Sequence, residues 1–172
     1  MHLSRRGLVD FMEQEFRLDN VTIRTATLRD RNMLLKLIRA YYRYDHLRFD
    51  RKMIEEGLLE LLKREEFGKA WLIFYGRRCI GYLIFTFLFD LEFGGRQVGV
   101  TDLFIDARFR RKGLGRRVLC ELEQYCQREG IKAIELQVIR ENRKVVAFYK
   151  RLGFHVHDRI PMSKRLDGRS WA

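Results

Sequence analysis

The 172-residue chain carries 35 Lys and Arg against 23 Asp and Glu, a formal net charge of +12 at pH 7. Hydrophobic residues make up 47% of the chain and charged residues 34%, which excludes a disordered chain and predicts one globular domain. No apolar run reaches membrane-spanning length, and the N-terminus lacks the apolar centre of a signal peptide. Cys79, Cys120 and Cys126 show no zinc or CxxC spacing, so we expect reduced thiols in a cytoplasmic protein without membrane contact.

Hydrophobic periodicity predicts a mixed α/β (α+β) domain at 20–172, preceded by an N-terminal extension at 1–19 with a short helix at 5–17. In chain order the predicted elements are a strand at 21–27, helices that follow Thr27 and Asp50, strands at 70–76, 79–90 and 97–106, a helix between Gly113 and Gly130, a strand at 131–139, a helix after Asn142, and a final strand pair at 154–159 and 160–166. This βααβββαβαββ order places an antiparallel meander before a strand–helix–strand crossover, so the predicted sheet is mixed.

Polar residues at the predicted helix starts support these boundaries. Thr27 followed by Asp30 resembles a capping box in which Asp replaces the usual Glu or Gln. Asp50 and Asn142 are typical N-cap residues and precede the second and the last predicted helix.

A basic turn with two glycines, RFRRKGLGRR at 108–117, joins a predicted strand to a predicted helix. Such a turn presents free backbone N–H groups at a helix N-terminus, where the helix dipole adds partial positive charge. This arrangement favours binding of a phosphate group. The alternative interpretation is a solvated basic turn, which we prefer for Arg108 and Arg117 taken individually.

Two motifs carry a resemblance to a known family. The stretch 110–115, RRKGLG, matches R/Q-x-x-G-x-G/A, and the stretch 142–154, NRKVVAFYKRLGF, matches N-x-x-(small apolar)-x-x-F-Y-x-x-x-G-F. With the predicted strands between them, residues 20–166 resemble the GNAT superfamily of acetyl-CoA-dependent N-acetyltransferases. The resemblance implies the GNAT fold, acetyl-CoA as co-substrate, and direct attack of a primary amine on the acetyl group in a ternary complex.

The resemblance also implies a cofactor site at the basic turn. Backbone N–H groups of the turn would wrap the pyrophosphate, and Gly113 and Gly115 would allow its close approach. Arg111 stands where the family often has glycine, so its side chain would point outward. We expect Arg110, Lys112 and Arg116 to neutralise phosphate charge, and the backbone of the preceding strand to bind the pantetheine arm. The implied cofactor-binding residues are Leu103, Phe104, Ile105, Arg110, Arg111, Lys112, Gly113, Leu114, Gly115, Arg116 and Asn142.

Two residues match catalytic positions of the family. Tyr149 falls where the family places a general acid, and a phenol can protonate or hydrogen-bond a departing thiolate. Asp102 lies where relatives often carry an acidic residue, commonly Glu, that acts as base. The neighbouring Thr101 lacks the further acid of polyamine acetyltransferases, which weakens that analogy. The alternatives are aromatic packing beside Phe148 for Tyr149 and an ion pair with an arginine for Asp102.

The acceptor end is expected at YYRYDH, 41–46, which closes the first helix and overhangs the acceptor site in this fold. Charge and cation–π contacts are the interactions by which its side chains would hold an amine. The candidate substrate-binding residues are Tyr42, Asp45 and His46. Asp90 and Glu92 would add negative charge, and the alternative is a plain surface loop. His155 and His157 have strand spacing, but no further ligand joins them, so we expect no metal.

Three functions stay open from the sequence. The first is an N-acetyltransferase that acts on a small-molecule or protein amine, with a homodimer as one possible state. The second is a nucleic-acid-binding module that uses the +12 charge, although no zinc-finger or RNP motif accompanies it. The third is an inactive GNAT-fold acyl-CoA sensor or interaction protein. Polyamines, aminoglycosides, amino acids, protein lysines and N-termini all remain open as acceptors.

Overall fold

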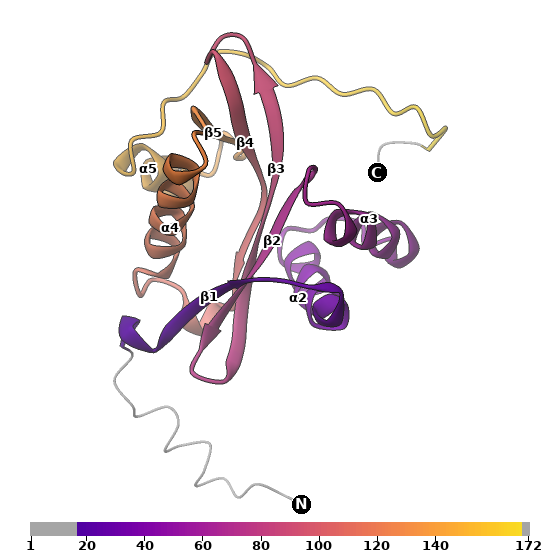
Figure 1. Ribbon diagram of the computed structural model, residues 1–172, viewed down its shortest axis with the longest axis vertical. Coiled ribbons are helices and arrows are strands. Elements are labelled where there is room, and N and C mark those ends of the chain that lie inside the picture. The colour runs from indigo at the N-terminus through magenta and orange to yellow at the C-terminus, as the bar shows by residue number, and fades with distance from the viewer. Residues whose placement is uncertain (1–16, 170–172) are drawn as a thin grey trace, which may run out of the picture.

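A central β-sheet with helices on both faces forms the protein, whose computed structural model describes residues 17–169 (Figure 1). In chain order the elements are β1 (Val21–Thr25), α2 (Arg31–Tyr44), α3 (Arg51–Lys63), β2 (Gly68–Tyr75), β3 (Arg78–Asp90), β4 (Gly95–Ile105), α4 (Leu114–Arg128), β5 (Ala133–Leu136) and α5 (Arg143–Arg151), with short 3-10 turns at Leu18–Asn20, Leu28–Asp30 and Ala107–Phe109. Helices α2 and α3 lie on one face of the sheet, and α4 and α5 on the other. The helix predicted at 5–17 falls almost entirely outside the described residues.

The strands follow one another across the sheet in the order β1-β2-β3-β4-β5. Neighbours from β1 to β4 are antiparallel, whereas β5 runs parallel to β4 and is reached through α4. The predicted meander, crossover and mixed sheet are therefore confirmed. β5 is shorter than the strand predicted at 131–139, because only Ala133–Leu136 pair with β4.

Side-chain caps begin three helices where the sequence predicts them. Thr27 and Asp30 form a capping box at the turn that leads into α2. The carboxylate of Asp50 accepts the backbone N–H three residues later at 3.1 Å, and the side-chain oxygen of Asn142 does the same at 3.3 Å. Each such cap satisfies a donor that the helix itself leaves unpaired and contributes about 1 kcal/mol.

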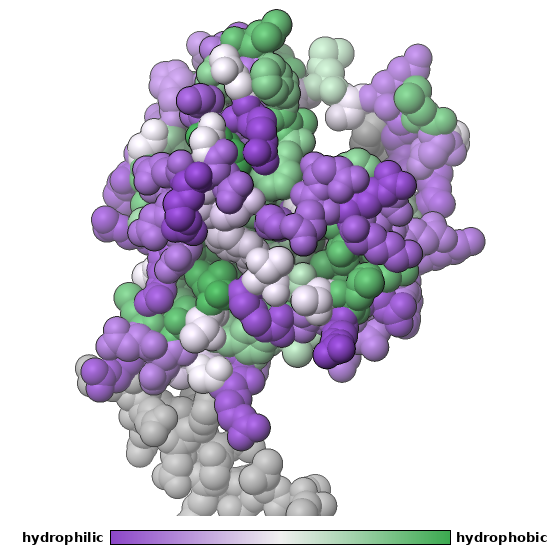
Figure 2. Space-filling view, viewed as in Figure 1, coloured by the Kyte–Doolittle hydropathy of each residue, from purple (hydrophilic) through white to green (hydrophobic). Residues whose placement is uncertain are grey.

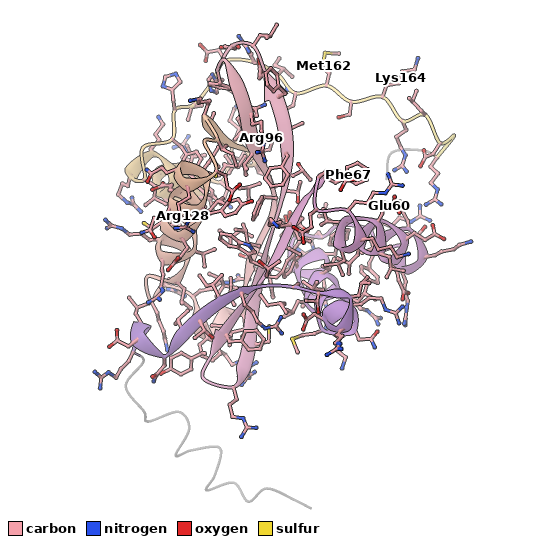
Figure 3. All side chains as sticks on the ribbon, in the orientation of Figure 1. Glu60, Phe67, Arg96, Arg128, Met162 and Lys164 are labelled. Atoms are coloured by element: carbon pink, nitrogen blue, oxygen red, sulfur yellow. The ribbon has the colours of Figure 1, made fainter. Side chains whose placement is uncertain are left out.

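Apolar side chains pack between the sheet and both helix layers. Figure 3 draws the side chains on the ribbon, and the surface seen in Figure 2 is mostly hydrophilic. The core on the α4 side includes Val98, Val100, Ile105, Val118 and Leu122, and the core on the α2 side includes Leu34, Ile38, Leu58, Leu72, Tyr82 and Phe104. Burying one large aliphatic side chain stabilises the fold by about 1.5–3 kcal/mol. The two cores therefore hold β3 and β4 firmly between the helix layers.

A β-bulge interrupts the pairing of β3 with β4. Phe85 pairs with Val100 and Ile84 pairs with Asp102, so Thr101 is the extra residue. The Thr101 hydroxyl donates to the Ile84 carbonyl at 3.2 Å, which supplies a hydrogen bond at the interruption. A bulge shifts the alternation of side chains by one residue, so the bulge decides which face of the sheet the following residues occupy.

The predicted strand pair at 154–159 and 160–166 is wrong. Within the part of the chain that the structure describes, residues 154–169 contain no strand and form an extended tail that runs from α5 past the β3–β4 turn toward α3 (Figure 1). A strand needs a neighbouring strand for its backbone hydrogen bonds, and the sheet ends at β5. The apolar residues that suggested strands are exposed instead: Ile160 by 78%, Met162 by 92% and Leu166 by 90%.

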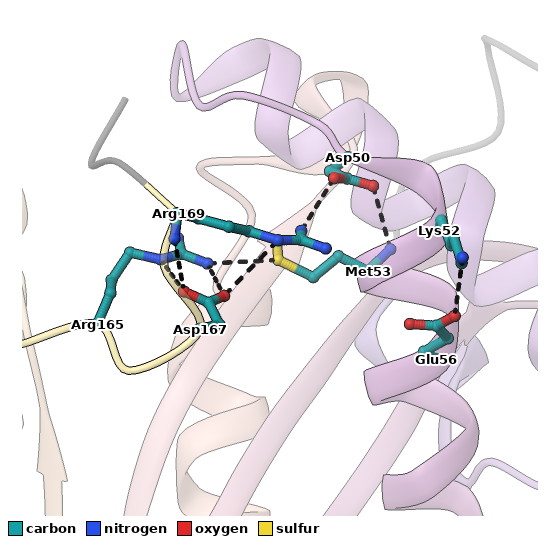
Figure 4. A network of polar contacts seen from close by, with 7 residues as sticks. All are labelled: Asp50, Lys52, Met53, Glu56, Arg165, Asp167 and Arg169. Carbon is teal, nitrogen blue, oxygen red and sulfur yellow. Dashed lines mark hydrogen bonds and ion pairs between the residues drawn. The ribbon is translucent and has the colours of Figure 1, made fainter.

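Ion pairs hold the tail on the α3 side of the molecule. Arg159 contacts Glu92 in the β3–β4 turn at 2.7 Å, and Arg169 contacts Asp50 at the start of α3 at 3.1 Å. Figure 4 shows the second anchor, where Asp167 lies between Arg169 and Arg165. These contacts hold the tail at the β3–β4 turn and at the start of α3.

Candidate active site

The first turn of α4 presents backbone donors at the glycine motif. Gly113 is the N-cap, has a φ of +80°, and offers no side-chain cap. The first three N–H groups of the helix belong to Leu114, Gly115 and Arg116, and such groups have no partner within the helix. Arg111 also has a positive φ, +59°, which is strained for a residue with a side chain. The turn therefore has the backbone geometry that favours an anion.

Arg110, a predicted phosphate contact, lies against other residues of the protein. Its Nε donates to the Ile105 carbonyl at 2.7 Å, and its guanidinium lies 4.0 Å from the centre of the Tyr44 ring and 5.5 Å from that of Phe104. Arg110 thus ties the turn to α2 by cation–π contacts. Lys112 and Arg116 are exposed on the same turn and remain the candidates for neutralising a phosphate.

Gly115 allows the two sequence motifs to touch. A Cβ atom at this position would lie 3.2 Å from the ring of Phe148 in α5. That separation is tighter than ordinary van der Waals contact, so a side chain would push α5 away from α4. The glycine of the first motif therefore fixes the position of the second motif.

The β4 strand separates from β5 beside this turn. Only the stretch from Gln97 to Val100 pairs with β5, so the later part of β4 has a free edge. The backbone N–H of Asp106 donates to the Ile80 carbonyl at 2.8 Å, so by alternation the backbone of Phe104 also faces β3. The backbone of Leu103 and Ile105 faces the opening. Because the Ile105 carbonyl accepts from Arg110, the backbone of Leu103 is the stronger candidate to bind a ligand at this edge.

Asp102 is brought to the α2 face by the bulge. Tyr82 donates its hydroxyl hydrogen to Oδ2 of Asp102 at 3.2 Å. The pKa of Asp102 is raised to about 6: burial raises it most, the hydrogen bond from Tyr82 lowers it, and the nearby charge of Asp45 raises it. Within residues 17–169 Asp102 forms no ion pair, which rules out the predicted alternative of an arginine partner there. A half-buried carboxylate with this pKa can exchange a proton near neutral pH.

Two of the three predicted acceptor residues lie near Asp102. Asp45 lies close enough to Asp102 to raise the pKa of that carboxyl. The pKa of Tyr42 is raised mainly by burial and, to a smaller extent, by the charge of Asp102. Sequence reasoning missed Tyr41, whose hydroxyl donates to Oδ2 of Asp45 at 3.4 Å. Tyr41 and Asp45 are four residues apart at the end of a helix, and this spacing could have predicted that their side chains meet.

His46 has a structural position at the end of α2. It is exposed, has a φ of +56°, and follows the C-cap of the helix. The N–H of Leu47 donates to the Tyr42 carbonyl at 2.8 Å, which closes the helix in the manner of a Schellman motif. Glycine usually fills this left-handed position, so helix termination accounts for the local geometry of His46 without a ligand.

Tyr149 lies in α5 between two aromatic rings. Its ring centre is 5.1 Å from that of Phe148 and 5.4 Å from that of Phe154, and burial raises the pKa of its hydroxyl. Asn142 uses its side-chain oxygen to cap α5, which leaves its amide hydrogens as donors. The packing and capping interpretations of these residues are thus observed, and they are compatible with the chemical ones.

The remaining candidates are engaged elsewhere. Asp90 accepts the backbone N–H of Glu92 at 2.8 Å, and Glu92 pairs with Arg159 of the tail. The rings of His155 and His157 lie 5.3 Å apart. Across the described ranges, no three histidine, cysteine or carboxylate side chains gather where they could hold a metal ion.

Comparison with known families settles the class of protein. Residues 31–154 match the model of the acetyltransferase (GNAT) family, a range that includes the glycine turn and the α5 motif. The chain belongs to the GNAT acetyltransferase family. From residue 17 to residue 169, no helix of this GNAT protein is long and apolar enough to cross a membrane.

Named relatives are N-acetyltransferases. An uncharacterized N-acetyltransferase of Methanocaldococcus jannaschii is 29% identical over 136 residues, which cover 77% of this chain and 60% of that protein. The chain thus spans less than two-thirds of the archaeal relative. The thialysine N-epsilon-acetyltransferase of Sus scrofa is 24% identical over 78% of this chain and 84% of its own length. The structure of AAC(6')-Iy with the bisubstrate analogue CoA-S-monomethyl-acetylneamine shares the fold, with a TM-score of 0.72 at 14% identity over 84% of this chain and 97% of that one.

Proposed function

We propose that this protein transfers the acetyl group of acetyl-CoA to a primary amine by direct attack in a ternary complex. The observation that carries the proposal is Asp102, a half-buried carboxylate that forms no ion pair with residues 17–169 and lies on β4 where this strand parts from β5. In a strongly basic chain, a carboxylate of this kind is available to a cationic substrate.

The cofactor would be held mainly by the backbone. The N–H groups that begin α4 would bind the pyrophosphate, and Lys112 and Arg116 would add charge. Leu103, on the free edge of β4, would hydrogen-bond the pantetheine arm. The structure of AAC(6')-Iy with a CoA-containing analogue supports a cofactor of this type.

The amine would lose its proton to Asp102, directly or through a water molecule. An alkylammonium has a pKa near 10.4 in water, so few acceptor molecules arrive neutral at pH 7. A base with a pKa of about 6 is better matched to this task than an ordinary aspartate, and desolvation in the site lowers the pKa of the amine. Tyr42 and Asp45 would hold the acceptor beside this carboxylate.

Tyr149 would donate a hydrogen bond to the departing sulfur. The ordinary pKa of a phenol already lies above that of a thiol, and burial raises the pKa of Tyr149 further, so complete proton transfer is disfavoured while hydrogen-bond donation is retained. The residue thus stays protonated throughout the physiological pH range, and the departing thiolate takes its proton from water, because a thiol has a pKa near 8.5.

An acceptor screen that detects CoA release tests the proposal. It should include lysine-like amines, because the Sus scrofa relative is named for a side-chain amine acceptor. We expect turnover with at least one amine, and loss of most of that turnover below pH 7 in Asp102→Asn. Recovery at higher pH is expected, because the amine then arrives neutral.

Two results would contradict the proposal in different ways. Tight acetyl-CoA binding without turnover on any amine would favour a sensor. Salt-sensitive binding to unrelated DNA sequences, without a response to acetyl-CoA, would favour a nucleic-acid-binding module. A parallel loss at every pH in Asp102→Asn would assign this residue to substrate orientation.

A further inference from the structure

Tyr82 is a buried phenol on β3 whose hydroxyl reaches the candidate active site. Its side chain is fully buried, and its ring centre lies 6.1 Å from that of Phe104, the residue that pairs with it on β4. The hydroxyl donates to Oδ2 of Asp102 at 3.2 Å. A buried hydroxyl needs a partner, but a backbone carbonyl would satisfy it equally well. The partner of the Tyr82 hydroxyl is instead the carboxylate that we propose as the base of the reaction.

The groups that act on Asp102 come from β3 and from α2 with its C-cap residue. Tyr82 faces it from β3, and Tyr41, Tyr42 and Asp45 face it from α2. Arg110, in the turn after β4, is directed onto Tyr44 and Phe104 and donates to Ile105. Within the described residues, Tyr82 is the hydrogen-bond donor of the Asp102 carboxylate, and no cation shares that role.

The geometry leaves one carboxylate oxygen for the substrate. Oδ2 is held by a phenol whose side chain is fully buried in the core on the α2 side. Oδ1 has no hydrogen bond from residues 17–169. A hydrogen bond to the charged form of a carboxylate favours that form, whereas burial disfavours it. The phenol therefore both orients the carboxylate and keeps it able to accept a proton.

We propose that Tyr82 is a positioning residue for Asp102, which fixes Oδ2 and directs Oδ1 toward the acceptor amine. This inference rests on the proposed role of Asp102 in the proposed function. It adds a residue that neither sequence motif contains, on a strand that the cofactor does not contact in the proposed arrangement.

Tyr82→Phe tests the inference, because it keeps the ring and removes only the hydroxyl. Without the donor, the pKa of Asp102 rises above about 6, so the acidic limb of kcat/KM should move up by about one pH unit. A shift of that size lowers kcat/KM about fivefold at pH 6 and leaves it almost unchanged at pH 8.5. The ratio of variant to wild-type values cancels the titration of the amine, which is common to both.

Tyr125→Phe is the matched control. Tyr125 packs against Trp71 and Phe85 on the α4 side of the sheet, so its hydroxyl is separated from Asp102 by the sheet. Its removal should leave the acidic limb in place. Thermal unfolding of both variants establishes that they are folded. 3-Fluorotyrosine incorporated at position 82 gives a second variant with the ring and hydroxyl intact; as a stronger donor, it should move the limb to lower pH.

A direct titration separates this inference from the proposed function. The carboxyl carbon signal of Asp102, followed by NMR in the wild type and in Tyr82→Phe, reports the pKa without any acceptor. An upward shift supports the inference even if the acceptor screen finds no substrate. Superimposable titrations in folded wild type and Tyr82→Phe would overturn it.

A double variant tests whether Tyr82 acts through Asp102. In the Asp102→Asn background, Tyr82→Phe should cause no further change in the pH profile, because the group that titrates is already absent. A limb that still shifts in that background, or a uniform loss at every pH in Tyr82→Phe alone, would also overturn the inference.

Discussion

At the scale of single residues, Asp30 and Asp102 show how partners decide what a carboxylate can do. The guanidinium of Arg24 bonds Asp30 at 2.7 and 2.8 Å and holds the pKa of that carboxyl well below its usual range. Burial instead raises the pKa of Asp102, which has a phenol as its donor. Asp30 is therefore fixed as an anion at neutral pH, whereas Asp102 can change its charge.

Tyr149→Phe is expected to lower kcat about tenfold and to leave acetyl-CoA affinity within about twofold, the loss of one transition-state hydrogen bond. The ring contacts with Phe148 and Phe154 persist in this variant, so the fold should be unaffected. Steady-state kinetics with CoA release as readout, together with a rapid-quench measurement that identifies the limiting step, checks the expectation. An unchanged kcat with chemistry limiting would leave Tyr149 with a packing role only.

At the scale of elements, the glycine turn before α4 can be tested as the predicted pyrophosphate site. Gly113→Asp places a carboxylate at the helix start where the pyrophosphate is expected, and like charges should weaken acetyl-CoA binding about tenfold or more. Gly76→Asp in the β2–β3 turn is a matched control. Both glycines have positive φ, +80° and +56°, and a Cβ at either position meets no heavy atom within 3.4 Å. Calorimetric titration of both variants with acetyl-CoA separates charge from backbone strain, and equal affinities would remove the turn from the cofactor site.

The end of α2 offers a test of stability. His46 occupies a left-handed position with φ of +56°, so His46→Gly should raise the free energy of unfolding by about 0.5–1 kcal/mol. Arg43→Gly, inside the same helix, should lower it by about 1 kcal/mol. Urea denaturation measures both changes. If His46→Gly raised the KM for the acceptor, this would support the predicted contact of His46 with the substrate. If the variant were less stable, this would contradict the proposed role of His46 in ending the helix.

Local signals explain which elements could be predicted from the sequence. The caps at Thr27 and Asp50 depend on contacts three residues apart, and α4 is marked by its own periodicity. The strand pair at 154–166 failed because alternation shows that a segment suits a sheet, not that a partner strand is available. The bulge in β4 also leaves a trace in the sequence. Apolar residues stand at even-numbered positions before it, Val98 and Val100, and at odd-numbered positions after it, Leu103 and Ile105.

The candidate site was predictable only in part for the same reason. The two motifs gave the glycine turn and Tyr149, and the family resemblance added Asp102 as a candidate. The hydrogen bond from Tyr82 to Asp102 joins residues 20 positions apart, and the direction of the Arg110 side chain depends on the distant Tyr44. Such contacts follow from the register of β3 with β4 and from the packing of α2, which no local pattern encodes.

At the scale of the whole molecule, the free edge of β4 joins the two faces of the sheet. The α4 face carries the glycine turn and Tyr149, while Asp102 and Asp45 lie on the α2 face. In the proposed function the thioester and the amine would therefore approach from opposite faces and meet at this edge. Arg110 connects the two sides, because it belongs to the turn and contacts Tyr44 at the end of α2.

The tail is anchored by exposed ion pairs and its apolar residues contact solvent, so we expect it to be loosely held. Exposed pairs stabilise weakly and are screened by salt. Glu92→Lys turns the Arg159 contact into a repulsion and should speed tryptic cleavage within 159–169 several-fold, with no change in Tm. Glu141→Lys, at a residue with no ion pair in the described ranges, is the control and should leave cleavage unchanged. If residues 154–166 instead pair as strands in solution, the tail should resist trypsin in every variant, and its deletion should lower Tm, because a paired strand contributes to the cooperative fold whereas a loosely held tail does not.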